Sequence, residues 1–354
     1  MRKNLFKRIF SVLLAFALLF SLVACKPNHK EAVTPKVILF IGDGMGPNHV
    51  YNAELYYEEQ MYFSSFETKT FVDTNSLSGL TDSAAAATAM ATGTRTINSL
   101  VAKDLSGDLP SITEIAKQNK YGVGVVTSDL ISGATPAGFS AHSDSRDNSA
   151  KILLSQSTQN IDLLLGAGDY AIYKTKFTEN GWTWVTSFTQ LSLKNKRYVA
   201  TFEEVVPENP TDEAPTLTQL ACYAVDFMEK NYPTGYFLMI EGAKIDKASH
   251  NKDIQTMLKN MLDFSNAIKA VDAKLEGNRY DYSIIVTADH ETGNLQKASS
   301  KENIANSLYK SNNHTTTNVN LYFKSTATVS CEILTKKLIL NTDIFLLCKY
   351  LLAV

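Results

Sequence analysis

The 354-residue chain has almost no net charge, since 34 Lys and Arg balance 36 Asp and Glu. A chain without an excess of basic residues offers no basic face to neutralise phosphates, so its composition gives no indication of nucleic-acid binding. Cysteine is scarce, with four residues, which excludes a small scaffold held together by disulfides. No internal repeat or low-complexity linker interrupts the sequence after residue 36. These absences leave an ordinary globular chain, because disordered, collagenous and coiled-coil proteins have other compositions.

No apolar run reaches the length of about 20 residues that a membrane-spanning helix needs. The longest, residues 9–24, has 16 residues and follows four basic residues, Arg2, Lys3, Lys7 and Arg8. This pattern predicts a signal peptide over residues 1–24. The run ends in Leu22-Val23-Ala24-Cys25, which resembles a bacterial lipobox. We therefore expect a lipid on Cys25, a tether over residues 25–35, and a protein held outside the cytoplasm on a bacterial membrane surface.

An ordinary secretory signal and a membrane-spanning anchor are the two alternatives for this N-terminal segment. The other cysteines, Cys222, Cys331 and Cys348, are odd in number. We expect them to be buried free thiols, with a disulfide between two of them as the alternative.

Four short runs of apolar, often β-branched residues predict strands that are buried on both faces. They cover residues 37–41, 122–127, 236–240 and 283–287. Segments with helical character alternate with them at residues 83–91, 111–119, 216–230 and 254–274. This alternation predicts an α/β fold, a mostly parallel sheet with helices on both faces, as one domain over residues 36–354.

Three of the predicted strands run directly into acidic residues. Asp43 follows the first strand, Glu241 the third, and Asp289-His290 the fourth. In an open α/β sheet, ligands bind outside the carboxyl ends of the strands. Carboxylates from separate parts of the sequence should therefore meet at one edge of the sheet, which predicts a site for a polyvalent cation.

Two local patterns point to the same chemistry. Asp246 and His250 are four residues apart, so on a helix they share a face and both could bind one ion. A carboxylate oxygen and an imidazole nitrogen suit zinc. Asp43 lies between Gly42 and Gly44, which let the backbone turn sharply beside a ligand. Taken alone, each pattern also fits a solvated surface residue.

Ser83 precedes an alanine-rich stretch, residues 84–91, that predicts a helix. The free N–H groups and the dipole at a helix N-terminus favour an anion, so an alkoxide on Ser83 would be stabilised there. The alternative is that Ser83 simply caps the helix. Arg146 could bind two oxygens of a phosphate with its planar fork, or it could form a surface ion pair.

Taken together and in this order, these segments resemble the alkaline phosphatase family of zinc-dependent phosphomonoesterases, from about Val37 to Phe323. The motifs that carry the resemblance are FIGDGMG, TDSAAAATAMATG, ATPAGFSAHSDSR, IEGAKIDKASH, VTADHETGN and NNHTTTNVNLYF. The resemblance implies a large mixed sheet sandwiched by helices. It also implies hydrolysis of varied phosphate monoesters through a phosphoserine, and a homodimer.

The resemblance also implies roles for single residues. Ser83 matches the nucleophile, Arg146 the arginine that clamps the phosphoryl oxygens, and Lys247 a lysine that reaches phosphate through water in some bacterial relatives. The matching metal ligands are Asp246, His250 and His314 for the first zinc; Asp43, Asp289 and His290 for the second; and Asp43, Thr135 and Glu241 for a third cation, usually magnesium. His142 matches no ligand, and we expect it to be structural.

The chain departs from the family at Gly133, where relatives commonly have Asp or His, which weakens the case for the third cation. After Phe323 the sequence diverges. A sulfatase of the same superfamily is disfavoured, because Ala85 and Ala87 stand where its motif needs Pro and Arg. A phosphodiesterase of the superfamily remains an alternative. An inactive phosphate-binding lipoprotein is the alternative from another class.

Overall fold

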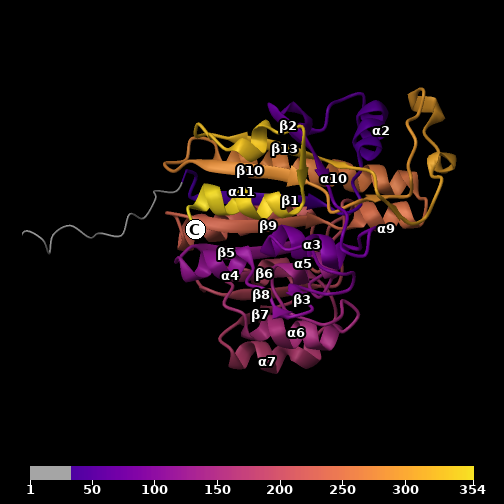
Figure 1. Cartoon of the computed structure of the whole chain (residues 1–354). Helices are drawn as coiled ribbons and strands as arrows, with labels where there is room; N and C mark the ends of the chain where they lie inside the picture. Colours follow the sequence, from indigo (N-terminus) through magenta and orange to yellow (C-terminus); the bar gives the residue numbers. More distant parts are fainter. Residues whose placement is uncertain (1–32) are drawn as a thin grey trace, which may run out of the picture. The chain divides into compact units, whose positions relative to one another are not determined.

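The four apolar runs form the centre of one sheet in the computed structural model, which describes residues 33–354 (Figure 1). They become β1 (Lys36–Gly42), β5 (Gly122–Leu130), β9 (Tyr236–Gly242) and β10 (Tyr282–Thr287). These strands are parallel neighbours in the order β10-β1-β9-β5, and three of them are buried along their whole length. The predicted strands are confirmed. The predicted signal peptide, Cys25 and most of the tether lie outside the described residues.

The whole sheet has ten strands in the order β14-β2-β13-β10-β1-β9-β5-β6-β8-β7. Only β13 runs against its neighbours, β10 and β2, while the other neighbouring pairs of this sheet are parallel. The expectation of a mostly parallel, mixed sheet is therefore confirmed. The outer strands are β2 (Thr68–Asp73), β6 (Leu163–Ala167), β7 (Thr183–Val185), β8 (Tyr198–Phe202), β13 (Val319–Ser325) and β14 (Leu338–Leu340).

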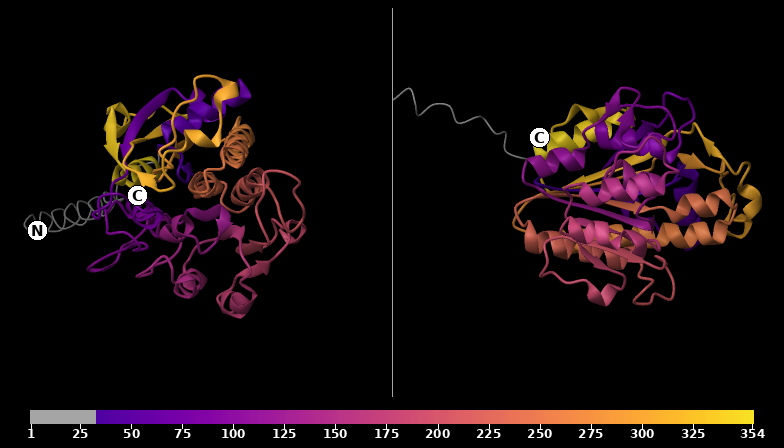
Figure 2. Two further views of the ribbon diagram at one scale, coloured as in Figure 1. Left: turned by 90° about the vertical axis from the view of Figure 1, so that its right-hand side faces the viewer. Right: turned by 90° about the horizontal axis from the view of Figure 1, so that it is seen from below.

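Helices cover both faces of the sheet (Figure 2). On one face, α8 (Leu217–Asn231) packs along α10 (Ile254–Leu275). On the other face, α3 (Ser83–Thr92) contacts both α5 (Ala134–Gly138) and α11 (Thr342–Leu352). The remaining helices are α2 (Pro47–Tyr57), α4 (Ile112–Gln118), α6 (Ser149–Thr158), α7 (Lys174–Glu179) and α9 (Lys244–His250). The layered architecture is the predicted one.

Short elements complete the chain. Two small antiparallel pairs lie outside the main sheet, β3 (Lys103–Asp104) with β4 (Gly107–Asp108) and β11 (Glu291–Thr292) with β12 (His314–Thr315). The 3₁₀ segments are η1 (Tyr62–Ser65), η2 (Ala171–Tyr173), η3 (Phe188–Gln190), η4 (Lys301–Asn303), η5 (Asn306–Leu308) and η6 (Glu332–Thr335). The pairing of β11 with β12 matters for the site, because it brings His314 beside the segment that follows β10.

The cysteine side chains of the described part, Cys222, Cys331 and Cys348, are free thiols. Cys348 is buried, as expected, but Cys222 and Cys331 are only partly buried, so the expectation of burial is wrong for these two. Among the helices of residues 33–354, none combines the length and apolar character needed to cross a membrane.

Candidate active site

The carboxyl ends of β1, β9 and β10 bring the predicted carboxylates together. Parallel register aligns Ile41 with both Glu241 and Thr287, so the residues that follow each strand emerge at one edge. The turn after β1 is tied to both neighbours, because the N–H of Asp43 donates to the carbonyl of Gly242 at 3.2 Å. The N–H of Gly44 donates to Oδ1 of Asp289 at 3.0 Å. The sequence prediction of a shared acidic edge is confirmed.

One group of possible metal ligands consists of Asp43, Asp289 and His290, whose ligand atoms lie within 4.8 Å of one another. Nε2 of His290 is 3.2 Å from Oδ2 of Asp289 and 3.5 Å from Oδ1 of Asp43. All three side chains are buried. Although Asp289 and His290 are adjacent in sequence, the chain leaves the strand there and both face the same point. This group has the composition expected for the second zinc.

A second group consists of Asp246, His290 and His314, again with ligand atoms within 4.8 Å of one another. His250, the fourth residue after Asp246 on α9, joins it, since its Nε2 is 3.3 Å from Oδ2 of Asp246 and 3.1 Å from Nε2 of His314. The residues expected at the first zinc therefore meet in space. His290 belongs to both groups, which places the two candidate cation positions side by side.

Hydrogen bonds to backbone carbonyls orient two of these imidazoles. Nδ1 of His314 lies 3.0 Å from the carbonyl oxygen of Thr81, and Nδ1 of His250 lies 2.5 Å from that of Asn312. Because a carbonyl can only accept, each Nδ1 carries a proton, so each Nε2 presents a lone pair to the cluster when the imidazole is neutral. This is the tautomer that a metal ligand needs.

Two carboxylate oxygens of the cluster have no hydrogen-bond partner in the described residues, although they are buried. They are Oδ1 of Asp43 and Oδ2 of Asp289. Burial, together with the nearby charges of Asp289 and Asp246, raises the pKa of Asp43 well above its usual value. Buried acceptors without donors are rare and costly, and a cation between them would satisfy both. The residues present therefore fit the metal ions that the sequence predicts.

Charge partners counteract burial at the other two carboxylates. Burial alone would raise the pKa of Asp246, but its bond with His250 and the charge of His290 hold it below the usual value. Burial would likewise raise the pKa of Asp289, but the charge of His290 lowers it. Both side chains are therefore ionised at neutral pH, which is the form that binds a metal.

Ser83 is the first residue of α3, and Asp82, not Ser83, caps the helix: its Oδ1 accepts from the N–H of Ala85 at 2.9 Å. The alternative that Ser83 is a plain cap is therefore excluded. The Ser83 side chain is buried and its Oγ lies 3.2 Å from Nε2 of His290. The hydroxyl thus combines a helix N-terminus with an edge of the metal-ligand cluster, as predicted.

Arg146 lies beside the same helix start, with Nη1 3.2 Å from Oδ2 of Asp82. Its backbone N–H donates to the carbonyl of Ser99, which fixes the loop that carries it. His142 from this loop contacts Glu114 at 3.2 Å and the carbonyl of Ala102, so it has the structural position that the sequence predicted. Asp82 was not predicted as a site residue, because in the sequence it is only the residue that precedes Ser83.

The residues expected at the third cation lie close to this edge. Glu241 is buried, accepts a hydrogen bond from Thr127, and burial raises its pKa to about 8. The hydroxyl oxygen of Thr135, on α5, is buried without a hydrogen-bond partner in the described residues. Gly133 directly precedes this helix, so no side chain at that position faces the site.

Lys247 forms an ion pair with a carboxylate that is not among the possible metal ligands. Its Nζ lies 2.5 Å from Oδ2 of Asp129, at the end of β5, and its side chain is 53% exposed. Asp129 was not predicted as a site residue, because an acidic residue at the end of one strand has no local signal for a partner 118 positions away.

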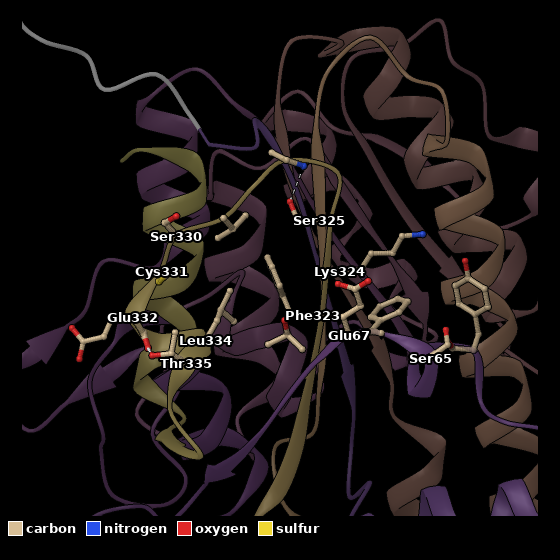
Figure 3. A pocket seen from close by; sticks show the side chains of 15 residues that line it. Ser65, Glu67, Phe323, Lys324, Ser325, Ser330, Cys331, Glu332, Leu334 and Thr335 are labelled. Carbon is tan, nitrogen blue, oxygen red and sulfur yellow. Dashed lines mark hydrogen bonds between the residues drawn. The ribbon is translucent and has the colours of Figure 1, made fainter.

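One large cavity of the described part lies away from this cluster. It has a volume of about 830 Å³ and is lined by residues such as Phe323, Ser325 and Leu334 (Figure 3). Ser325 pairs with Ser283 at the start of β10, so this cavity opens near the amino ends of the parallel strands. It contains none of the predicted site residues. The chemistry is therefore assigned to the cluster at the opposite edge, on the side chains gathered there.

Solved structures share this fold. Alkaline phosphatase from the Antarctic bacterium TAB5 superposes with a TM-score of 0.76 at 24% identity, over 91% of this chain and 99% of that one. Alkaline phosphatase from Thermus thermophilus gives a TM-score of 0.75 at 17% identity, over 93% and 95% of the two chains. These likenesses confirm the alkaline-phosphatase-like architecture expected from the sequence.

Sequence comparison gives relatives of the same kind. Alkaline phosphatase 4 of Bacillus subtilis is 32% identical over 299 residues, which cover 76% of this chain. Alkaline phosphatase of Escherichia coli is 28% identical over 75% of this chain. The matched region spans 64% of the length of the Bacillus protein, less than two thirds. The family described as Alkaline phosphatase matches residues 35–178 and 203–337. The chain belongs to the alkaline phosphatase family.

Proposed function

We propose that the chain hydrolyses phosphate monoesters at this site, with Ser83 as the nucleophile. The observation that carries the proposal is the 3.2 Å separation between Oγ of Ser83 and Nε2 of His290, the residue common to both ligand groups. A hydroxyl at a helix N-terminus and beside cations can be activated as an alkoxide. Membership of the family supports the same reaction.

The metal ligands are proposed as three sets. The first zinc is assigned to Asp246, His250 and His314; the second zinc to Asp43, Asp289 and His290; and magnesium to Asp43, Thr135 and Glu241. When bound, these ions would lower the pKa of the nucleophile and of water and offset the charge of the phosphoryl oxygens. The partnerless oxygens of Asp43 and Asp289 support the second set most directly. Gly133 leaves the magnesium set with fewer surrounding polar groups.

The side chains of this protein then divide the remaining work. Ser83 Oγ attacks phosphorus as the ester oxygen departs, which forms a phosphoserine and releases the alcohol. Water attacks this phosphoserine, restores the hydroxyl and releases inorganic phosphate. The N–H groups at the start of α3 and the guanidinium of Arg146 hold the equatorial oxygens in both steps. A monoester presents three such oxygens and a diester two, so Arg146 favours the monoester.

Location and assembly belong to the proposal as well. Residues 1–24 are proposed as a signal peptide and Cys25 as the lipidated residue, which would keep the enzyme outside the cytoplasm on the bacterial membrane. Small phosphate monoesters of several kinds are the proposed substrates, since recognition concentrates on the phosphoryl group. A homodimer is the assembly proposed from the family.

The experiment compares hydrolysis of p-nitrophenyl phosphate and bis-p-nitrophenyl phosphate by residues 26–354 at alkaline pH, with zinc and magnesium. We expect turnover of the monoester that a chelator abolishes and zinc restores, with the diester cleaved far more slowly. Preference for the diester would indicate a phosphodiesterase instead. Bound zinc with no turnover of either ester would indicate an inactive phosphate-binding protein.

A further inference from the structure

Behind the ligand cluster lies a buried polar contact that the reaction itself does not use. It joins His49 on α2, Ser249 on α9 and Tyr309 in the segment before His314. The side chains of His49 and Ser249 have no exposed surface, and Tyr309 is 4% exposed. Residues this far apart in the sequence meet here only because the fold brings three segments together.

The hydrogen bonds of this trio have one consistent direction. The N–H of Gly46 donates to Nδ1 of His49 at 3.2 Å, so the His49 proton must reside on Nε2. Nε2 lies 3.0 Å from Oγ of Ser249, and Ser249 donates its own proton to the carbonyl of Ile245 at 2.8 Å. Tyr309 then donates to Ser249 at 3.2 Å. The serine hydroxyl therefore accepts two bonds and donates one, which satisfies it completely.

Burial keeps His49 in this form, because it lowers the pKa of the imidazole to about 4. A second proton on the ring would face the N–H of Gly46, so the arrangement requires the neutral tautomer. His49 stands three residues after Gly46 and takes the place of the acidic residue that often accepts this N–H at a helix start.

Each member of the trio belongs to a segment that carries metal ligands. His49 follows the turn of Asp43, and Ser249 lies between Asp246 and His250 on α9. Tyr309 precedes His314 by five residues, and its ring packs on Gly293, three residues after His290. A Cβ at Gly293 would lie 2.5 Å from this ring, and the φ of 91° at Gly293 also favours glycine.

We propose that His49, Ser249 and Tyr309 form a positioning hub that holds the ligand-bearing segments in register and thereby sets how tightly the site retains zinc. The hub rests on the proposed zinc site. It is a set of positioning residues, since none of the three contacts the reacting atoms. Groups that orient metal ligands typically change metal affinity by roughly 10- to 100-fold when they are removed.

The test measures zinc release from the zinc-loaded protein into a chromogenic chelator, for wild type, Tyr309→Phe and His49→Asn. Tyr309→Phe removes one hydroxyl and keeps the ring, so it should fold. His49→Asn keeps an acceptor for the N–H of Gly46 but is too short to reach Ser249. We expect about tenfold faster zinc release in His49→Asn, and a smaller increase in Tyr309→Phe.

Asn52→Ala is the matched control. Asn52 is equally buried on the same helix as His49. It forms hydrogen bonds with the backbone of Gln296 and Ala298, and neither of these is a proposed metal ligand. Its zinc release should stay at the wild-type rate even where the melting temperature of the metal-free protein falls. Equal rates in wild type and both hub variants would overturn the hub and leave the proposed function standing. Wild-type protein that binds no zinc would overturn both.

Discussion

At the residue scale, the two carboxylate oxygens of Asp82 make different contacts, which the sequence alone did not predict. Its Oδ1 caps α3 and its Oδ2 contacts both Arg146 and the N–H of Ser99. A single half-buried carboxylate thus fixes the helix that begins at Ser83 and orients the guanidinium beside it. Because Arg146 contacts Asp82 through Nη1, its other N–H donors remain available for a phosphoryl group.

Replacing Arg146 with Ala should weaken binding of the phosphoryl group without removing zinc, because Arg146 is not among the proposed ligands. Hydrogen bonds to charged groups contribute about 1.5–3 kcal/mol, so we expect the KM for p-nitrophenyl phosphate to rise at least tenfold. Inhibition by inorganic phosphate should weaken by a similar factor. Arg146→Lys should restore only part of the loss, since an ammonium cannot bind two oxygens as a planar fork does. Zinc lost from Arg146→Ala would show that the arginine is structural.

At the residue scale, the sequence predicted which possible metal ligands lie together, but not the residues that surround them. Asp43, Asp289 and His290 follow strands, and Asp246 and His250 have helical spacing, so local patterns pointed to them. The partners of these residues, such as Asp129 with Lys247 or Ser249 with His49, have no local pattern. Such pairs are 118 and 200 positions apart, and only the folded chain shows that they meet.

At the element scale, α3 and α5 bring Ser83 and Thr135 to the site by packing unusually closely. Every residue of α3 is buried, and most are Ala. Opposite them stands Gly138 on α5, where an added Cβ would lie 2.8 Å from Cβ of Ala87. Small residues on both helices therefore set the distance between the nucleophile and the proposed magnesium ligand.

Gly138→Ala should force these two helices apart. An added methyl in a well-packed core typically costs about 1–3 kcal/mol, so the free energy of unfolding should fall by that amount. Activation by magnesium should weaken more than binding of zinc, since α5 carries Thr135 and none of the zinc ligands. Denaturant unfolding and a magnesium titration measure the two effects. An unchanged midpoint would mean that the helices can adjust without cost.

Elements buried on both faces were predictable, and elements at the margins were not. β1, β9 and β10 are continuous apolar runs, and the start of α8 is marked by a capping box of Thr216 and Gln219. β14 has three residues at the edge of the sheet, and its alternating exposure gives a weak signal. α11 lies in the divergent segment after Phe323. It packs against α3, and this contact, which the sequence does not show, buries one face of the helix in the core.

At the scale of the whole molecule, the site joins parts of the chain from Asp43 to His314. Several of its groups hold protons in the metal-free fold that an unfolded chain would release. Burial raises the pKa of Glu241 from 4.5 to about 8. Burial would lower the pKa of His290, but the charge of Asp289 raises it above 6.5, and the bond with Asp246 does the same for His250.

The stability of the metal-free protein should therefore fall as pH rises from about 6.5 to about 8.5. In this range the folded state binds more protons than the unfolded state, and stability decreases with pH wherever that holds. His49 and His314 have lowered pKa values and act in the opposite direction, but below pH 6.5. Zinc and magnesium displace these protons and should remove the decrease. Thermal melts at pH values of about 6.5 and about 8.5, with chelator and with metals, test this. An equal change of melting temperature between the two pH values, with and without metals, would contradict it.

Trapping the phosphorylated intermediate on Ser83 tests the proposed reaction directly. The zinc-loaded protein is mixed with p-nitrophenyl phosphate, quenched in acid, and its peptides are mapped by mass spectrometry. We expect one phosphoryl group on the peptide that contains Ser83. The Ser83→Ala variant should keep its zinc and carry no such group. Its turnover should be slower than that of wild type by about a thousandfold or more. Turnover at the wild-type rate in Ser83→Ala, or a phosphoryl group on another residue, would contradict the proposed reaction.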